Sequence, residues 1–268
     1  MGNVFIDASK VTKGRFIDTR FNLQDKLWGQ KVFEQAHIEG ALFWDLERDL
    51  SDMIKTEGRH PMPSKEKLQN LFETSGLNYE DTIYVYDQGG APFAARAWWM
   101  LKYANFPNVF IVNGGYDALI EAGWQSSAEV SVFPPTQLSI TWNDSIYATR
   151  QDVKRIVDGV DKAILLDARA RVRYLGETET IDKVAGHIPT AKNFDWEQLK
   201  EGTFLRGNEL LQQQVQKDEQ IVVYCGSGVT ASPLYAVLAD LGYDDLKLYV
   251  GSYSDWITQY DIETGDNN

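Results

Sequence analysis

The chain has 268 residues, 43% of them hydrophobic and 24% charged, which is typical of a globular protein and enough for two domains. Its formal net charge of -13 argues against binding to nucleic acid or to an acidic membrane surface, because both would repel it. The single cysteine excludes an internal disulfide, and no apolar stretch approaches the roughly 18 residues of a membrane span, so we expect a reducing compartment, the cytoplasm.

Short apolar runs alternate with helix-like stretches in the first half of the chain. Ile83 to Tyr86 predicts a buried strand, residues 94–104 have the length and composition of a helix, and Phe110 to Val112 predicts another strand. Strands that alternate with helices favour a mostly parallel sheet covered on both faces. We therefore expect an α/β fold.

A break in this pattern separates the two halves. Residues 131–144 contain the paired Pro134 and Pro135 and predict an exposed linker. We accordingly expect a first domain at residues 1–134, a linker at 135–145 and a second domain at 146–268.

The second half repeats landmarks of the first in the same order. The run from Ile83 to Gly90 returns 138 residues later as Ile221 to Gly228. Three further matches are Asp18-Thr19-Arg20 with Asp167-Ala168-Arg169, His37-Ile38 with His187-Ile188, and Gly114-Gly115-Tyr116 with Gly251-Ser252-Tyr253. Four landmarks in one order indicate a duplicated domain.

Cys225 stands at the end of the apolar run in the second copy, before a glycine-rich turn that leads into a helix. Ligands of parallel sheets bind beyond the carboxyl ends of the strands. We expect peptide N–H groups of the turn to converge on the sulfur, to attract an anion and to lower the thiol pKa from about 8.5 toward neutrality. A cysteine that only fills space in the core is the alternative. The first copy has Asp87 at this position, so we expect that copy to be non-catalytic.

Together these features resemble the two-domain sulfurtransferases of the rhodanese type. The resemblance rests on the Asp-x-Arg element of both copies, on the cysteine loop, on the segment His187 to Ala191 and on the helix-like Arg96-Ala97-Trp98-Trp99-Met100. It implies two tandem rhodanese-like domains, each a mostly parallel sheet flanked by helices. The loop from Cys225 to Ala231 is similar to that of 3-mercaptopyruvate sulfurtransferases, whereas thiosulfate-preferring members place basic residues at Gly226 and Ser227.

The resemblance also implies a reaction. Cys225 would take sulfur from 3-mercaptopyruvate, hold it as a persulfide and pass it to an external acceptor, either cyanide or a thiol such as thioredoxin or a small thiol. No metal or organic cofactor is expected. Backbone N–H groups of the loop would stabilise the anionic sulfur, which makes Gly226, Gly228, Val229 and Thr230 candidate substrate-binding residues. Thiosulfate remains the rival donor.

A carboxylate donor needs a cation, and the family's substrate-binding arginine aligns with Arg173. An arginine fork binds a carboxylate with two hydrogen bonds, although a surface arginine is the alternative interpretation. Members of the 3-mercaptopyruvate type often carry a second arginine nine residues later. Here that position is Asp182, with Lys183 beside it as a further candidate.

Proton transfer to the leaving group is assigned by resemblance to Ser227, assisted by a histidine of the first domain that His37 matches. The repeat of this histidine as His187 leaves a role in the fold open as the alternative. Either Asp25 or Glu34 would orient His37. An aromatic wall of the pocket is expected at Phe93, which completes the site residues predicted from the first domain.

Two other classes of protein are alternatives. A cysteine phosphatase would need an arginine five or six residues after the cysteine, where this chain has Thr230 and Ala231. A non-enzymatic sulfur carrier or redox sensor would need the same reactive cysteine without a donor pocket. Multiple turnover with a small donor and acceptor separates that alternative from an enzyme.

Overall fold

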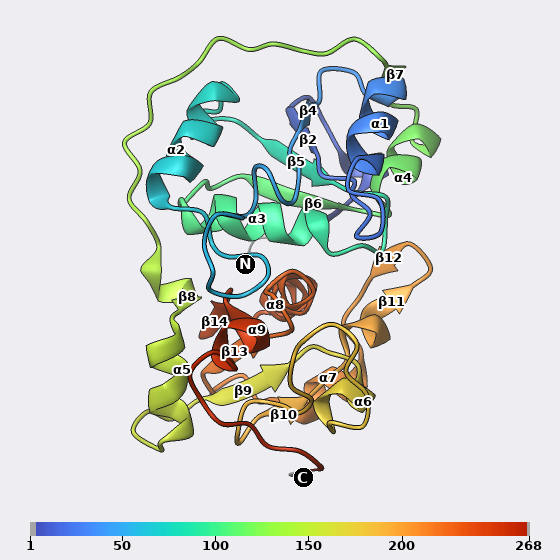
Figure 1. Ribbon diagram of the computed structural model, residues 1–268. Coiled ribbons are helices and arrows are strands. Elements are labelled where there is room, and N and C mark those ends of the chain that lie inside the picture. Colours follow the sequence, from blue (N-terminus) through green and yellow to red (C-terminus); the bar gives the residue numbers. More distant parts are fainter. Residues whose placement is uncertain (1–3, 267–268) are drawn as a thin grey trace.

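The structure is a computed structural model that describes residues 4–266. It contains two five-stranded sheets, one in each half of the chain, and all the strand pairs within them are parallel. Helices flank each sheet, and the two α/β domains lie one above the other in Figure 1. The predicted α/β architecture with mostly parallel sheets is confirmed.

The elements of the first domain follow the predicted alternation. Its strands are β1 (Phe5–Asp7), β2 (Arg15–Asp18), β3 (His37–Ile38), β4 (Leu42–Phe43), β5 (Ile83–Tyr86), β6 (Val109–Asn113) and β7 (Ser126–Ser127). Its helices are α1 (Trp28–Gln35), α2 (Lys65–Thr74), α3 (Phe93–Tyr103) and α4 (Gly115–Glu121). The large sheet has the order β1-β6-β5-β2-β4, and β3 pairs separately with β7.

The second domain repeats this order. Its strands are β8 (Tyr147–Ala148), β9 (Ile164–Asp167), β10 (Lys192–Asn193), β11 (Lys200–Glu201), β12 (Phe204–Leu205), β13 (Ile221–Tyr224) and β14 (Leu246–Tyr249). Its helices are α5 (Arg150–Val157), α6 (Arg171–Tyr174), α7 (Glu209–Gln214), α8 (Ala231–Asp240) and α9 (Ser252–Trp256). The order β8-β14-β13-β9-β10 matches that of the first sheet strand by strand, as a duplication requires.

The two domains share one apolar core. Side chains alternate along β5 and β13, so that Val85 and Val223 face inward between the domains while Tyr86 and Tyr224 face the outer helices. The inward faces and helices α2, α3, α7 and α8 form a single cluster. In Figure 1, α3 and α8 lie against each other at the centre of the molecule.

The Asp-x-Arg element is structural in both domains. Arg20 Nη2 lies 2.6 Å from Asp18 Oδ2, and Arg169 Nη2 lies 2.6 Å from Asp167 Oδ2, with all four side chains buried. Each arginine also donates to a backbone carbonyl of a following loop, at Ala36 and Gly186 respectively. A buried pair held in this way fixes the loop after each second strand.

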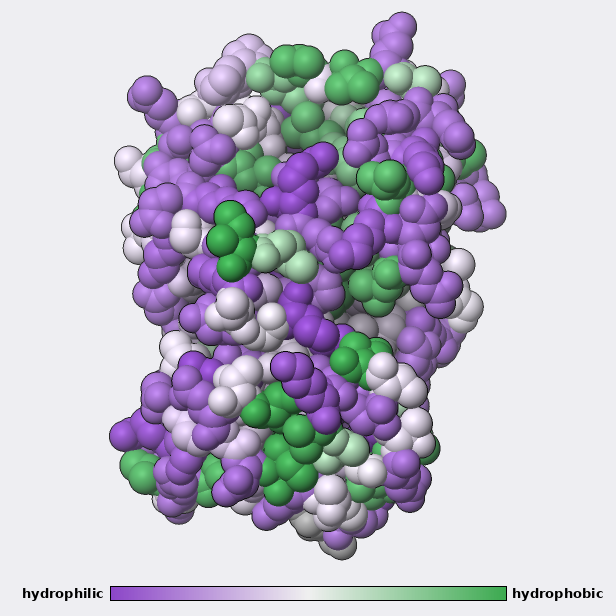
Figure 2. Space-filling view, in the orientation of Figure 1, coloured by the Kyte–Doolittle hydropathy of each residue, from purple (hydrophilic) through white to green (hydrophobic). Residues whose placement is uncertain are grey.

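The surface is mostly hydrophilic on the face that Figure 2 shows, and its outline narrows where the domains meet. None of the helices within residues 4–266 combines the length and the apolar character needed to cross a bilayer.

Candidate active site

Cys225 follows β13 directly, at the carboxyl end of the central strand of the second sheet. The residue is 1% exposed. The Gly228 N–H donates to Cys225 Sγ at 3.1 Å, and the Cys225 N–H donates to Ser252 Oγ at the same distance. One backbone N–H of the turn thus points at the sulfur.

The turn is held in place by α9. Cys225 O accepts from the Tyr253 N–H at 2.9 Å, and Gly226 O accepts from the Ser254 N–H at 3.0 Å. Gly228 has φ +74°, and a Cβ there would lie 2.3 Å from Val250 O. Only glycine fits this position, because both the backbone conformation and the close carbonyl exclude a side chain.

Ser227 forms a hydrogen bond with a histidine of the other domain. His60 Nδ1 lies 2.9 Å from Ser227 Oγ, and both residues are largely buried. Burial, together with the positive charges of Arg96 and Arg59, lowers the pKa of His60 to about 3. The ring is therefore neutral near pH 7, where one of its nitrogens donates and the other accepts.

Arg173 lies in α6 and is already paired with two carboxylates. Its Nε donates to Glu179 Oε2 at 2.9 Å, and its Nη2 donates to Asp182 Oδ2 at 2.9 Å. The side chains of Glu179 and Asp182 are buried, and Arg173 keeps 19% of its side chain exposed. A donor carboxylate would therefore have to approach the remaining, exposed edge of Arg173.

Arg59 brings a second guanidinium to the cysteine loop from the first domain. Its Nε lies 3.0 Å from Asp182 Oδ1, and its backbone N–H donates to Ser254 Oγ at 3.1 Å. A Cβ built on Gly226 would lie only 2.2 Å from Arg59 Nη2. The guanidinium thus occupies the space that a side chain at position 226 would need.

Comparison with known proteins agrees with this arrangement. The family model described as the rhodanese-like domain matches residues 5–122 and again 149–259. The probable 3-mercaptopyruvate sulfurtransferase of Pseudomonas aeruginosa is 36% identical over 93% of this chain and 92% of its own. The chain belongs to the rhodanese family of sulfurtransferases. A putative thiosulfate sulfurtransferase of Mycobacterium tuberculosis, SseB, is 38% identical over 90% of this rhodanese and 86% of its own length.

Solved structures show the same fold over 90% or more of the chain. The 3-mercaptopyruvate sulfurtransferase from Leishmania major superimposes with a TM-score of 0.85 at 27% identity, covering 96% of this rhodanese and 75% of that chain. SseA from Escherichia coli, described as a 3-mercaptopyruvate sulfotransferase, gives 0.76 at 29% identity, covering 90% and 92% respectively.

The structure does not bring His37 to the cysteine loop of this rhodanese. His37 lies in β3, which pairs with β7 at the outer end of the first domain in Figure 1. Its Nδ1 and Nε2 face the carbonyls of Phe33 and Glu129, at 2.6 and 3.0 Å, and its ring stacks on Phe33. Fully buried and occupied on both nitrogens, His37 has a role in the fold.

His187, the repeat of His37, has the same environment in the second domain. Its ring stacks on Tyr174 at 3.8 Å between centroids, and its Nδ1 faces Tyr174 O at 2.8 Å. The carboxylates expected to orient His37 have other partners, because Asp25 pairs with Lys31 and Glu34 accepts from Gln30.

Sequence reasoning missed both His60 and Arg59. A usable signal was present, since the chain has three histidines and two of them, His37 and His187, repeat each other. A residue that a duplication repeats serves what both copies share, which is the fold. The unrepeated His60 was the better candidate for a function that only one copy performs.

The other predicted residues lie at different distances from the chemistry. Val229 is buried in the core, and Thr230 directly precedes α8, so both continue the cysteine loop into that helix. Lys183 is exposed beside Asp182. Phe93 begins α3 and packs edge to face on Phe21. It also lines a cavity of about 570 Å³, whose wall includes the loop after Asp87 together with Trp196 and Lys200.

Arg96 connects the family's arginine-tryptophan helix to the site. This residue of α3 is fully buried and donates to the carbonyls of Leu50 and His60, at 2.9 Å from Nη2 in each case. Burial lowers its pKa to about 10, and the charge of Cys225 opposes that shift. Arg96 therefore fixes the loop that carries His60 and places a positive charge within reach of the cysteine.

Asp87 closes the corresponding loop of the first domain. Its carboxylate accepts from the Gly89 and Ala94 N–H groups at 2.8 and 3.1 Å. Burial raises its pKa to about 6. Backbone N–H groups of this loop thus satisfy a carboxyl group, where in the second domain the Gly228 N–H faces the Cys225 sulfur.

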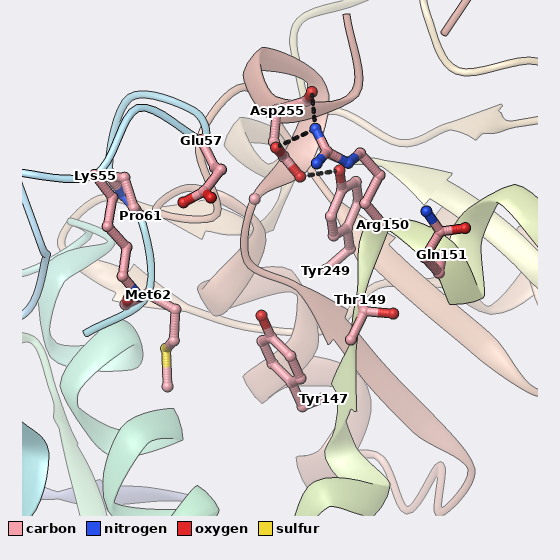
Figure 3. A pocket seen from close by; sticks show the side chains of 11 residues that line it. Lys55, Glu57, Pro61, Met62, Tyr147, Thr149, Arg150, Gln151, Tyr249 and Asp255 are labelled. Carbon is pink, nitrogen blue, oxygen red and sulfur yellow. Dashed lines mark hydrogen bonds and ion pairs between the residues drawn. The ribbon is translucent and has the colours of Figure 1, made fainter. Parts of the chain in front are cut away.

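A cavity of about 280 Å³ opens near the cysteine loop of the second domain, with side chains of both domains in its wall (Figure 3). There Arg150 Nη1 donates to Asp255 Oδ1 at 3.0 Å, and the Tyr249 hydroxyl donates to Asp255 Oδ2 at 2.6 Å. Neither Cys225 nor Ser227 lines it. Because these polar groups satisfy one another, we place the chemistry at the cysteine loop.

Proposed function

We propose that this rhodanese transfers sulfane sulfur from 3-mercaptopyruvate to a thiol or cyanide acceptor through a persulfide on Cys225. The observation that carries the proposal is the hydrogen bond between Ser227 and His60. Ser227 lies two residues after the nucleophile Cys225. A proton-transferring pair beside a cysteine suits a donor whose leaving group must be protonated. The leaving group of thiosulfate, sulfite, does not need to be protonated.

The first half-reaction balances without an oxidant. The Cys225 thiolate attacks the donor's thiol sulfur, an S–S bond forms, and the C–S bond breaks with its electron pair left on carbon as the pyruvate enolate. The transferred sulfur is oxidised to the sulfane level and the carbon is reduced. The proton of the donor's thiol passes through the Ser227 hydroxyl and the neutral His60 ring to the enolate, which yields pyruvate.

The second half-reaction regenerates the thiolate. An acceptor thiolate or cyanide attacks the outer sulfur of the persulfide, and the S–S bond breaks toward Cys225. With one cysteine in the chain, the acceptor thiol must be external, such as reduced thioredoxin or a small thiol. A reducing compartment such as the cytoplasm suits both this acceptor and the free thiol.

In this proposal each domain supplies different residues of the site. The first domain, residues 1–134, supplies His60 and Arg59 but has Asp87 where a nucleophile would stand. The second, residues 146–268, supplies Cys225 and its loop, and the linker at 135–145 joins them. Transfer thus depends on both domains.

The deciding experiment measures steady-state rates with 3-mercaptopyruvate and with thiosulfate, using one acceptor, and follows intact mass for a gain of about 32 daltons, one sulfur atom, on Cys225. We expect the mercaptopyruvate rate to dominate and the adduct to be absent from Cys225→Ser. A Cys225→Ser variant that still turns over would refute the mechanism.

Two relatives support the alternatives. SseB of Mycobacterium tuberculosis is named a putative thiosulfate sulfurtransferase, which favours thiosulfate as the second candidate donor. The sulfur carrier protein TtuD of Thermus thermophilus is 32% identical over 84% of both chains, which favours a carrier. Preference for thiosulfate in the rate assay would select the first, and a stable adduct without multiple turnover would select the second.

A further inference from the structure

The cysteine loop itself carries no basic side chain, and a positive charge reaches it from the other domain. Arg59 Nη2 occupies the space next to Gly226, as its 2.2 Å distance from a Cβ built there shows. The Arg59 side chain is 32% exposed, so part of it is accessible to a ligand, while its Nε and Nη2 face the Asp182 carboxylate.

Asp182 holds two arginines at once across the domain boundary. Its Oδ1 lies 3.0 Å from Arg59 Nε, and its Oδ2 lies 2.9 Å from Arg173 Nη2, while only 2% of its side chain is exposed. Among the described residues Arg173 also pairs with Glu179, whereas Asp182 is the one acid that pairs with Arg59. Arg59 is therefore the less neutralised of the two cations.

We propose that Arg59 binds the anionic group of the sulfur donor above Gly226, and that Asp182 makes the site prefer a donor with one negative charge over a donor with two. This inference rests on the sulfurtransferase function proposed above. A guanidinium has five N–H donors, so Arg59, whose Nε lies 3.0 Å from Asp182 Oδ1 and whose Nη2 donates to Asp182 Oδ2 at 3.4 Å, still has N–H groups of Nη1 and Nη2 left for a donor carboxylate.

Asp182 limits how much negative charge the site accepts. A donor with a single carboxylate would bind the Arg59 guanidinium and the N–H groups of the cysteine loop, and it would add one negative charge beside the buried side chain of Asp182. Thiosulfate adds two, and like charges in a partly buried site repel each other strongly. Glycine and serine at positions 226 and 227 therefore do not by themselves determine donor preference, because Arg59 supplies the charge that they lack.

The test compares Arg59→Gln, Arg59→Lys and Asp182→Asn with Arg48→Gln, which removes an exposed first-domain arginine paired with Asp49. Donors are 3-mercaptopyruvate, its uncharged methyl ester and thiosulfate. We expect Arg59→Gln to raise the KM for the acid about tenfold or more, as loss of a charged hydrogen bond implies, and to leave the ester little changed. Arg59→Lys should be intermediate, and Arg48→Gln should match the unaltered enzyme.

Asp182→Asn should shift the ratio of kcat/KM values toward thiosulfate, because it removes the negative charge and keeps both arginines. An unchanged KM for the acid in Arg59→Gln, or equal losses for acid and ester, would overturn the role of Arg59. An unchanged donor ratio in Asp182→Asn would overturn that of Asp182. Should Arg59→Gln be unfolded at the assay temperature, Arg59→Lys and Asp182→Asn decide.

The same assay separates this inference from the function on which it rests. Failure of the unaltered enzyme to form the sulfur adduct from any donor would remove the proposed function itself. An active unaltered enzyme whose Arg59 variants keep their donor KM would remove only the present inference.

Discussion

His60 Nδ1 and Ser227 Oγ lie 2.9 Å apart although 167 positions separate the two residues in the chain. Each belongs to a different domain, and neither would be placed without the apolar core that joins the two sheets. The site is therefore a product of domain packing, and changes on either side of the boundary should affect the same chemical step.

Removing either partner of this pair should slow turnover. We expect His60→Gln and Ser227→Ala each to lower kcat with 3-mercaptopyruvate by about a hundredfold, a typical loss for acid–base catalysis. The double variant should lose little more, because the two groups act as a unit. Steady-state kinetics on the three variants provides the measurement.

His37→Gln is the matched control, since His37 is also buried but lies in the fold of the first domain. It should lower the melting temperature and leave kcat nearly unchanged. Multiplicative losses in the double variant, or a loss of kcat in His37→Gln, would contradict the assignment of His60.

The neutral state of His60 has a consequence for stability against pH. Burial, with Arg96 and Arg59, lowers its pKa from 6.5 in the unfolded chain to about 3 in the folded one. Between these values the unfolded chain binds a proton that the folded chain does not. The contribution of His60 to the free energy of unfolding is therefore fully present above about pH 6.5 and is lost as the pH falls toward 3.

Urea denaturation of the unaltered protein and of His60→Gln at several pH values tests this. The unaltered protein should lose stability more steeply below pH 6.5, because glutamine does not titrate. Parallel curves for the two proteins would show that the ring is not held neutral. Other buried acids, Asp87 among them, titrate equally in both and cancel in the difference.

Gly228→Ala should damage both stability and activity. The residue has φ +74°, and the added Cβ would lie 2.3 Å from Val250 O, so the loop must shift and carry with it the N–H that faces Cys225 Sγ. Gly202→Ala is the matched control, with φ +64° and no atom within 4 Å of its Cβ. It isolates the backbone cost, about 1 kcal/mol.

We expect Gly228→Ala to lose clearly more stability than Gly202→Ala in thermal or urea unfolding, and to lose turnover as well. Equal destabilisation by the two substitutions would mean that the loop relaxes freely around the new methyl group. Normal activity in Gly228→Ala would mean that the Gly228 N–H does not serve the sulfur.

The fold could be predicted from the sequence because its signals are local and occur twice. The runs at Ile83 and Ile221 are buried along all four strand residues in both domains, and the Asp-x-Arg elements form the same ion pair. Cys225 and Ser227 share one turn, so their proximity was also visible in the sequence.

The part of the site that comes from the first domain could not be predicted in the same way. Arg59 and His60 lie in a stretch without helix or strand, and the second copy repeats no such Arg-His pair, so neither periodicity nor repetition marks them. Which loop crosses to the other domain depends on how α3 packs on α8 and on the hydrogen bonds of Arg96. These are contacts between distant segments, which a local pattern does not encode.

Gly226→Ala offers a last test, directed at the space between the loop and Arg59. Unlike Gly228, Gly226 is not in the left-handed region, so alanine costs no backbone strain there. Its Cβ would lie 2.2 Å from Nη2 at the flexible end of Arg59 and would push the guanidinium aside, whereas Asp182 Oδ2, at 3.5 Å, would be at ordinary contact distance. We expect a small change in melting temperature and a raised KM for 3-mercaptopyruvate, and we expect no further rise when Arg59→Gln is added, because both changes remove the same contact. Additive effects on KM would show that the methyl group acts on the loop itself and that Arg59 acts elsewhere.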